Sequence, residues 1–168
     1  MQLRLLATVL LCASGAAQAT GPAKPSLADD ERKVVELTRQ LEARPLAEGS
    51  KDSRAWLIGW ITKAPQLQIN LCDTLQVMKR DQEYAWTSKL VVQTMFGMAA
   101  WELEHPASKG MDVEVQLAGV RSALKVYQAI LREHPGAKFA PMETLAAHEA
   151  AGDLPAHMKA VVADECKE

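Results

Sequence analysis

The sequence lacks the short motifs by which proteins commonly bind nucleotides, hold zinc or activate a serine. Its 168 residues contain no glycine-rich phosphate loop, GxGxxG, GxSxG, HExxH or CxxC. Four histidines are present, but no two of them are four residues apart, as paired helical metal ligands are. We therefore expect no metal and no cofactor, and the catalytic residues of any reaction are unknown from sequence.

Aromatic residues are few, and the chain has no excess of positive charge. Aromatic side chains make up 5% of the chain, and the formal net charge is −2. A domain that binds nucleic acid usually has a clustered basic surface, so we expect no nucleic-acid partner. Because no run of β-branched residues alternates with polar ones, the pattern favours an all-α fold.

The first nineteen residues have the three parts of a secretory signal peptide. Arg4 is followed by an uncharged apolar run over 5–13, and Ala17-Gln18-Ala19 is a small-x-small triplet. The run is shorter than the roughly 20 residues that span a bilayer. We predict a signal peptide at 1–19, cleavage before Thr20, no transmembrane anchor, and a protein that is periplasmic or secreted.

Two cysteines would remain after cleavage. Cys12 lies in the predicted signal peptide, which leaves Cys72 and Cys166. An even pair in an oxidising compartment most simply forms one disulfide. We predict this bridge, which would close a loop of about a hundred residues and contribute about 4–5 kcal/mol on the chain-entropy model.

Apolar spacing and proline positions divide the rest of the chain into helices. Residues 20–26 are predicted to be a flexible lead-in, and 27–168 a single helical domain. The clearest pattern runs from Val113 to Leu131 in steps of four and three residues and ends before Pro135. Helices are predicted at 27–43, from about 50 to before Pro65, at 72–78, 81–105, 113–134, 141–151 and 155–164, with an extended connector at 66–71. The predicted architecture is a compact bundle of about six or seven helices with one disulfide.

Large apolar side chains offer the one candidate binding site in the sequence. They could line a groove for an apolar ligand between helices, or they could simply fill the core. The six residues in question are Trp56, Trp60, Trp86, Met95, Met98 and Trp101. Because Tyr84 and Trp86 are two residues apart, they cannot share one face of the predicted 81–105 helix, and one of them is expected to be exposed.

Acidic residues near histidines offer weaker candidates for catalysis. Glu102 with Glu104, or Glu143 with His148 and Glu149, could act as an acid–base set. Exposed helix faces carry such neighbours routinely, so a cryptic hydrolase or lyase is the least favoured reading.

Segment 123–135 resembles the second helix of a tetratricopeptide repeat at Ala123, Tyr127 and Pro135. Ile130 departs from that pattern, because a small alanine is usual at its position. The resemblance would imply a peptide-binding scaffold if further repeats were present, and the sequence contains none that we can identify.

The mature chain is also similar to an uncharacterised family of exported helical bacterial proteins. The segments that carry the likeness are Arg54-Ala55-Trp56-Leu57 with Trp60, Asn70-Leu71-Cys72, and Leu117-Ala118-Gly119-Val120 with Ala123-Leu124. The resemblance implies export and a helical fold, and it implies no activity. Our leading expectation is a non-enzymatic protein that binds an envelope protein in a stress-related, chaperone-like or inhibitor-like role. The alternative is a small carrier of an apolar ligand.

Overall fold

The computed structural model describes residues 27–72 and 83–166, and within these ranges the chain forms six helices and no strand. The helices are α1 (Asp29–Ala43), α2 (Ser50–Ile61), α4 (Thr87–Glu104), α5 (Val113–Glu133), α6 (Ala140–Ala151) and α7 (Leu154–Glu165). The predicted all-α bundle is therefore confirmed. The predicted signal peptide, lead-in and nearly all of the 72–78 helix lie outside the described residues.

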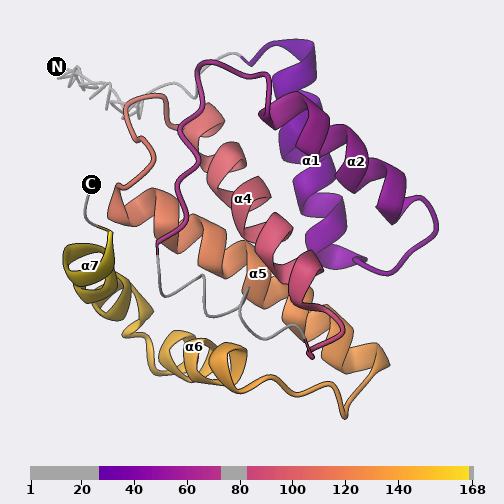
Figure 1. Cartoon of the computed structure of the whole chain (residues 1–168), viewed down its shortest axis with the longest axis vertical. Coiled ribbons are helices and arrows are strands. Elements are labelled where there is room, and N and C mark those ends of the chain that lie inside the picture. Colours follow the sequence, from indigo (N-terminus) through magenta and orange to yellow (C-terminus); the bar gives the residue numbers. More distant parts are fainter. Residues whose placement is uncertain (1–26, 73–82, 167–168) are drawn as a thin grey trace, which may run out of the picture.

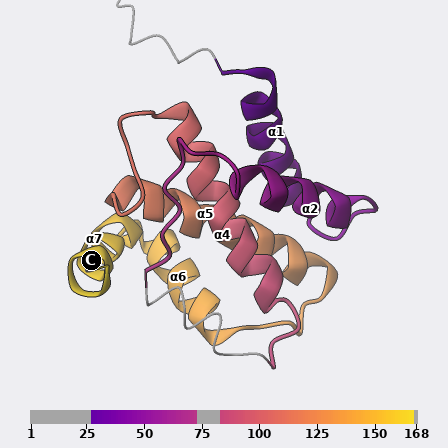
Figure 2. The ribbon, with the colours of Figure 1, turned by 45° about the horizontal axis from the view of Figure 1, so that its top comes forward.

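Helices α4 and α5 form the centre of the bundle. Helices α1 and α2 cover one side of this pair and α6 and α7 the other, as Figures 1 and 2 show from two directions. Each side has its own apolar cluster. The cluster under α6 and α7 includes Val120, Tyr127, Phe139, Met142, Leu154 and Met158. The cluster under α1 and α2 includes Val34, Leu41, Leu57, Ile61, Phe96 and Leu103.

The two central helices approach each other closely because both have glycine at the crossing. A Cβ on Gly97 of α4 would lie 2.9 Å from the carbonyl oxygen of Ala118, and a Cβ on Gly119 of α5 would lie 2.7 Å from Met98 Cγ. Helix α4 is consequently buried on nearly every face. Leu90, Val91 and Met98 of α4 are buried, whereas Met95 and Trp101 remain partly exposed.

Three helices end in the same way, two residues before a proline. Arg44, His105 and His134 each follow a helix, have φ between −132° and −138°, and donate the backbone N–H to the carbonyl four residues earlier. A residue before proline is disfavoured in the helical region, which explains the common conformation. The sequences Glu104-His105-Pro106 and Glu133-His134-Pro135 are alike because both form this type of helix end.

The start of α4 differs from the prediction. We predicted a helix from Asp81, but Glu83–Trp86 form a bend and a turn, and the helix begins at Thr87. The reason is tertiary: the Tyr84 ring stacks on Phe139 with centroids 4.4 Å apart, and the Tyr84 hydroxyl donates to the Ala137 carbonyl. These contacts hold Tyr84 against the segment that leads into α6.

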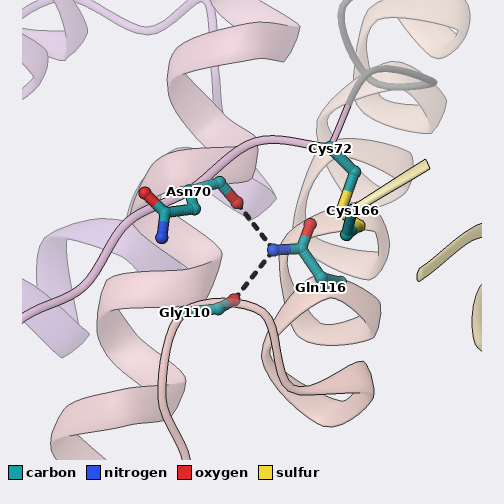
Figure 3. Close-up of a disulfide and its surroundings, with 5 residues drawn as sticks. All are labelled: Asn70, Cys72, Gly110, Gln116 and Cys166. Carbon is teal, nitrogen blue, oxygen red and sulfur yellow. Dashed lines mark hydrogen bonds between the residues drawn. A yellow bond between two sulfur atoms is a disulfide. The ribbon is translucent and has the colours of Figure 1, made fainter. Parts of the chain in front are cut away.

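Within the predicted connector over 66–71, Gln66 lies in a turn and residues 67–71 have no regular secondary structure. Hydrogen bonds from the central helices bind the backbone of this segment at both ends. Glu102 is 1% exposed and accepts the backbone N–H groups of Gln68, at 3.0 Å, and Gly110, at 2.9 Å. Gln116 donates its amide to the carbonyl oxygens of Asn70 and Gly110 (Figure 3). Charged and amide groups of the central helices therefore satisfy the polar backbone of this segment.

The predicted disulfide between Cys72 and Cys166 is confirmed, with Cα atoms 4.9 Å apart. Figure 3 shows it beside Gln116, at the end of the connector. The bridge joins the end of α7 to the connector, so a covalent link reinforces the contact between the C-terminal helices and the centre of the bundle. No helix in 27–72 or 83–166 is long and apolar enough to cross a bilayer.

Candidate functional site

The six residues predicted to line an apolar groove lie at separate places. Trp56 and Trp60 on α2 pack against the α1–α2–α4 cluster, while Trp86 packs against the other cluster. Met98 is 0% exposed and belongs to the packed α4–α5 crossing. Met95 and Trp101 are partly buried on α4. The prediction that these residues bind a ligand together remains untested, but the structure does not gather them around one hollow.

Two of the tryptophans already have partners within the protein. The Trp101 ring stacks on His105 with centroids 3.8 Å apart, one turn later in the chain. Lys33 of α1 places its ammonium 4.1 Å from the centroid of the Trp56 ring. Cation–π and stacking contacts of this kind help to fix the orientation of a partly exposed ring. These two indoles therefore stabilise the bundle locally.

Trp86 occupies a different setting, because it lines an open pocket of about 570 Å³ that we call the Trp86 pocket. The end of α5 and the start of α4 lie together at the lower right of Figure 1, and the α1–α2 turn and the start of α2 complete the wall. The lining residues are Pro45, Leu46, Ser50, Lys51, Arg54, Trp86, Lys89, Glu133 and His134.

The ends of four helices bring these side chains together. Pro45 follows the residue that ends α1, and Gly49 has φ +79°, a left-handed conformation that glycine adopts readily, directly before α2 begins. Trp86 is the residue before α4, and Glu133 is the last residue of α5. The pocket is thus built from short segments far apart in sequence.

Arg54 is the most constrained side chain of the Trp86 pocket. Its guanidinium donates to the carbonyl and hydroxyl oxygens of Ser50, at 3.2 and 3.1 Å, and to the carbonyl oxygen of Pro45. Nε is buried without a partner. Among the described residues no carboxylate pairs with this guanidinium, and burial lowers the pKa of Arg54. The side chain is fixed, partly desolvated and electrostatically uncompensated.

Lys89 is the second cation of the Trp86 pocket. Its ammonium lies 4.8 Å from the centroid of the Trp86 ring. Burial lowers the pKa of Lys89, and the neighbouring charge of Arg54 lowers it further. Glu133 also lines the pocket, yet within 27–72 and 83–166 neither Lys89 nor Arg54 forms an ion pair with it or with any other acid. Two neighbouring cations without a paired acid mark a place where an anion would be favourable.

Aromatic surface lies directly beside these charges. The Trp86 indole contacts the His134 imidazole with centroids 5.2 Å apart and planes tilted by 30°. His134 is exposed, and Trp86 is partly exposed. An indole next to cations suits a ligand that has both a negative group and an apolar or aromatic body.

The side chains considered for acid–base chemistry are occupied elsewhere. Glu102 accepts two backbone N–H groups, Glu143 accepts the Tyr127 hydroxyl at 2.5 Å, and Glu149 pairs with Arg121. His148 pairs with Asp153 at 2.9 Å and stacks on His157. No group of three or more potential metal ligands occurs in the part of the chain that the structure describes.

Sequence reasoning identified Trp86 but missed the charged residues around it. The sequence analysis named Arg54 only as part of a family resemblance, and no sequence pattern indicated a binding role for Lys89 or His134. The three residues lie on α2, on α4 and at the end of α5, so no local spacing relates them. Only the packing of the helices makes them neighbours.

Comparison with known proteins gives no relative for this chain: no family model, curated protein or solved structure matches it. The similarity to exported helical bacterial proteins therefore remains a prediction.

Proposed function

We propose that this protein is exported and acts in the cell envelope by binding another protein, with no catalytic step of its own, through the Trp86 pocket. One observation carries the proposal: Arg54 and Lys89, two partly buried cations without a carboxylate partner among the described residues, lie beside a partly exposed indole. Uncompensated charge next to aromatic surface is typical of recognition sites, because the partner supplies the missing opposite charge.

Two features support export. The leader over 1–19 has the parts of a secretory signal, and the disulfide between Cys72 and Cys166 is of a kind that persists in oxidising compartments. The disulfide stabilises the side of the bundle formed by α7, which would help a small domain to persist outside the cytoplasm.

Binding is favoured over catalysis by the state of the candidate acids and bases. Glu102 and Glu143 are each engaged in a structural hydrogen bond, and His148 is paired with Asp153. The Trp86 pocket is lined by cations, one exposed acid, His134 and one hydroxyl, that of Ser50. This hydroxyl accepts a hydrogen bond from Arg54, and no hydrogen bond joins it to His134 among the described residues. A hydrolase or lyase therefore has little support.

A carrier of an apolar ligand has less support than a protein binder. Such a carrier needs an apolar space between helices. Met98, a residue expected to line that space, is instead fully buried against α5. Trp86 lines a pocket, but this pocket is open and bordered by Lys51, Arg54 and Lys89.

The test is site-specific photo-cross-linking of the full chain, expressed with its own leader in a bacterial host. A photoreactive phenylalanine analogue replaces Lys51, which lines the Trp86 pocket, or Lys159, which is exposed on α7. We expect one envelope protein to cross-link from position 51 and not from 159. We also expect the added substitution Lys89→Glu to abolish that product. No cross-link at position 51, or an unchanged one with Lys89→Glu, would contradict the proposal.

Export is tested separately by intact mass measurement on the protein recovered from the envelope fraction. The expected mass corresponds to a chain that begins at Thr20 and lacks two hydrogens, as one disulfide requires. A chain that retains residues 1–19, or one found in the cytoplasm with both thiols free, would overturn the envelope assignment.

A further inference from the structure

An exposed face of α2 continues directly from the Trp86 pocket. Lys51, Ala55 and Ile58 are spaced by four and three residues, so they form one stripe along the helix, and all three are exposed. Lys51 lines the pocket, and Ile58 lies further along α2. Ile58 is 44% exposed and is the one large hydrophobic side chain with this degree of exposure in the described ranges.

The geometry of α2 sets the distance between the two side chains of a ligand that contacts both the Trp86 pocket and Ile58. Lys51 and Ile58 are seven residues apart, which corresponds to about 10 Å along a helix. An extended peptide advances by about 3.3 Å per residue, so about three residues cover that distance. A single extended segment could therefore place one side chain in the Trp86 pocket and another on Ile58.

Charge determines what enters the pocket. Lys51, Arg54 and Lys89 face a single acid, Glu133, among the lining residues. Arg54 already donates to oxygens of Ser50 and of Pro45, so it is held in place before any ligand arrives. Cations from two helices suit two neighbouring carboxylates better than they suit an uncharged segment.

We propose that the Trp86 pocket and the Ile58 face of α2 together bind a short acidic segment of a partner protein. In this segment two adjacent Asp or Glu side chains contact the pocket cations Lys51, Arg54 and Lys89. An apolar side chain about three residues after the acid beside Lys51 packs on Ile58. The inference rests on the proposed function and adds the chemistry of the partner: acidic residues followed, at a fixed interval, by an apolar one.

The test uses synthetic peptides with an N-terminal fluorescein and an amidated C-terminus, titrated with the purified mature protein and followed by fluorescence anisotropy. The probe GEEGGLG has the predicted pattern, GQQGGLG lacks the charges, and GEEGGSG lacks the apolar side chain. We expect GEEGGLG to bind at least about tenfold more tightly than GQQGGLG, since close charge pairs at interfaces are commonly worth that much. Binding of GEEGGLG should also weaken as salt is raised.

Protein variants assign each part of the peptide to its site. Lys89→Glu should abolish the difference between GEEGGLG and GQQGGLG, while the matched charge reversal Lys159→Glu on α7 should leave it unchanged. Ile58→Ser should lower the affinity for GEEGGLG to that for GEEGGSG and leave GEEGGSG unaffected. Circular dichroism of each variant checks that the helical fold is retained, so that a loss of binding reports on the surface.

The outcomes separate this inference from the proposed function. Equal binding of GEEGGLG and GQQGGLG, or binding of GQQGGLG only when its C-terminal carboxylate is free, would overturn the acidic-segment inference. The same would follow if inorganic phosphate displaced GEEGGLG equally from the wild type and from Lys89→Glu. A partner cross-linked from position 51 would still uphold the proposed function in these cases. Peptide discrimination without any cross-linked partner would support the binding chemistry and contradict the proposed function.

Discussion

Gly119 of α5 lies so close to Met98 of α4 that no side chain fits between the two helices. A Cβ at Gly119 would lie 2.7 Å from Met98 Cγ and 2.9 Å from the Thr94 carbonyl oxygen. The Gly119→Ala substitution should therefore force the central helices apart and lower the free energy of unfolding by about 1–3 kcal/mol, which urea denaturation would measure.

The matched control is a helical glycine with free space around it. A Cβ at Gly59 of α2 would meet no atom within 4 Å, and its φ is not positive. Gly59→Ala should raise the free energy of unfolding by up to about 1 kcal/mol, because alanine is the better helix former. Equal effects of the two substitutions would show that the close approach at Gly119 is not energetically important.

Glu102 should be essential to the position of the connector. Glu102→Ala leaves the backbone N–H groups of Gln68 and Gly110 without their acceptor and Lys109 without its ion pair at 3.5 Å. We expect a loss of about 3 kcal/mol in unfolding free energy. Glu36→Ala, at an exposed carboxylate of α1, should change it by less than about 0.5 kcal/mol. Similar losses from both variants would refute this role.

Reduction of the disulfide should destabilise the whole bundle. Its two cysteines are 94 residues apart, so opening the bridge restores a large amount of chain entropy to the unfolded state. The double variant Cys72→Ala, Cys166→Ala should lose up to about 4–5 kcal/mol. Reduced wild-type protein should show a similarly lowered urea midpoint. An unchanged midpoint on reduction would mean that packing alone fixes α7.

The chain has two tyrosines, and both should ionise late. Burial raises the pKa of Tyr84 to about 12, with a smaller effect from Glu143. Burial, together with the hydrogen bond to Glu143, raises the pKa of Tyr127 to about 12 as well. The unfolded chain ionises near pH 10. The stabilising contribution of these phenols is therefore complete below pH 10 and is lost as the pH rises toward 12.

Ultraviolet absorbance of tyrosinate tests this directly. The native protein should titrate with a midpoint near pH 12 and the urea-unfolded protein near 10. Tyr127→Phe should halve the amplitude of the signal, since one tyrosine remains. A native titration near pH 10 would contradict the burial of both phenols.

Much of the fold could be predicted because its signals are local. The 4–3 spacing from Val113 and the prolines after α1, α4 and α5 set helix positions to within a few residues. The presence of two cysteines outside the predicted signal peptide, Cys72 and Cys166, predicted the disulfide. The start of α4 was predicted wrongly because Tyr84 is held by Phe139, a contact across 55 positions that no local pattern contains.

The candidate site was largely beyond prediction for the same physical reason. Trp86 stood out by residue type, whereas the value of Arg54 and Lys89 depends on their lack of an acidic partner after folding. A missing partner is a property of the packed molecule. In the sequence, both residues have acids nearby, at Asp52 and Glu83, and look like ordinary surface charges.

The walls of the Trp86 pocket are helix ends, and this determines how a ligand would arrive. Arg54 donates a hydrogen bond to the carbonyl oxygen of Pro45. Trp86 lies at the start of α4, and His134 lies at the end of α5. The site is therefore already formed in the free protein, so binding costs little conformational entropy. Association should be a single fast step whose rate constant falls steeply with ionic strength, with no slow rearrangement after the first encounter.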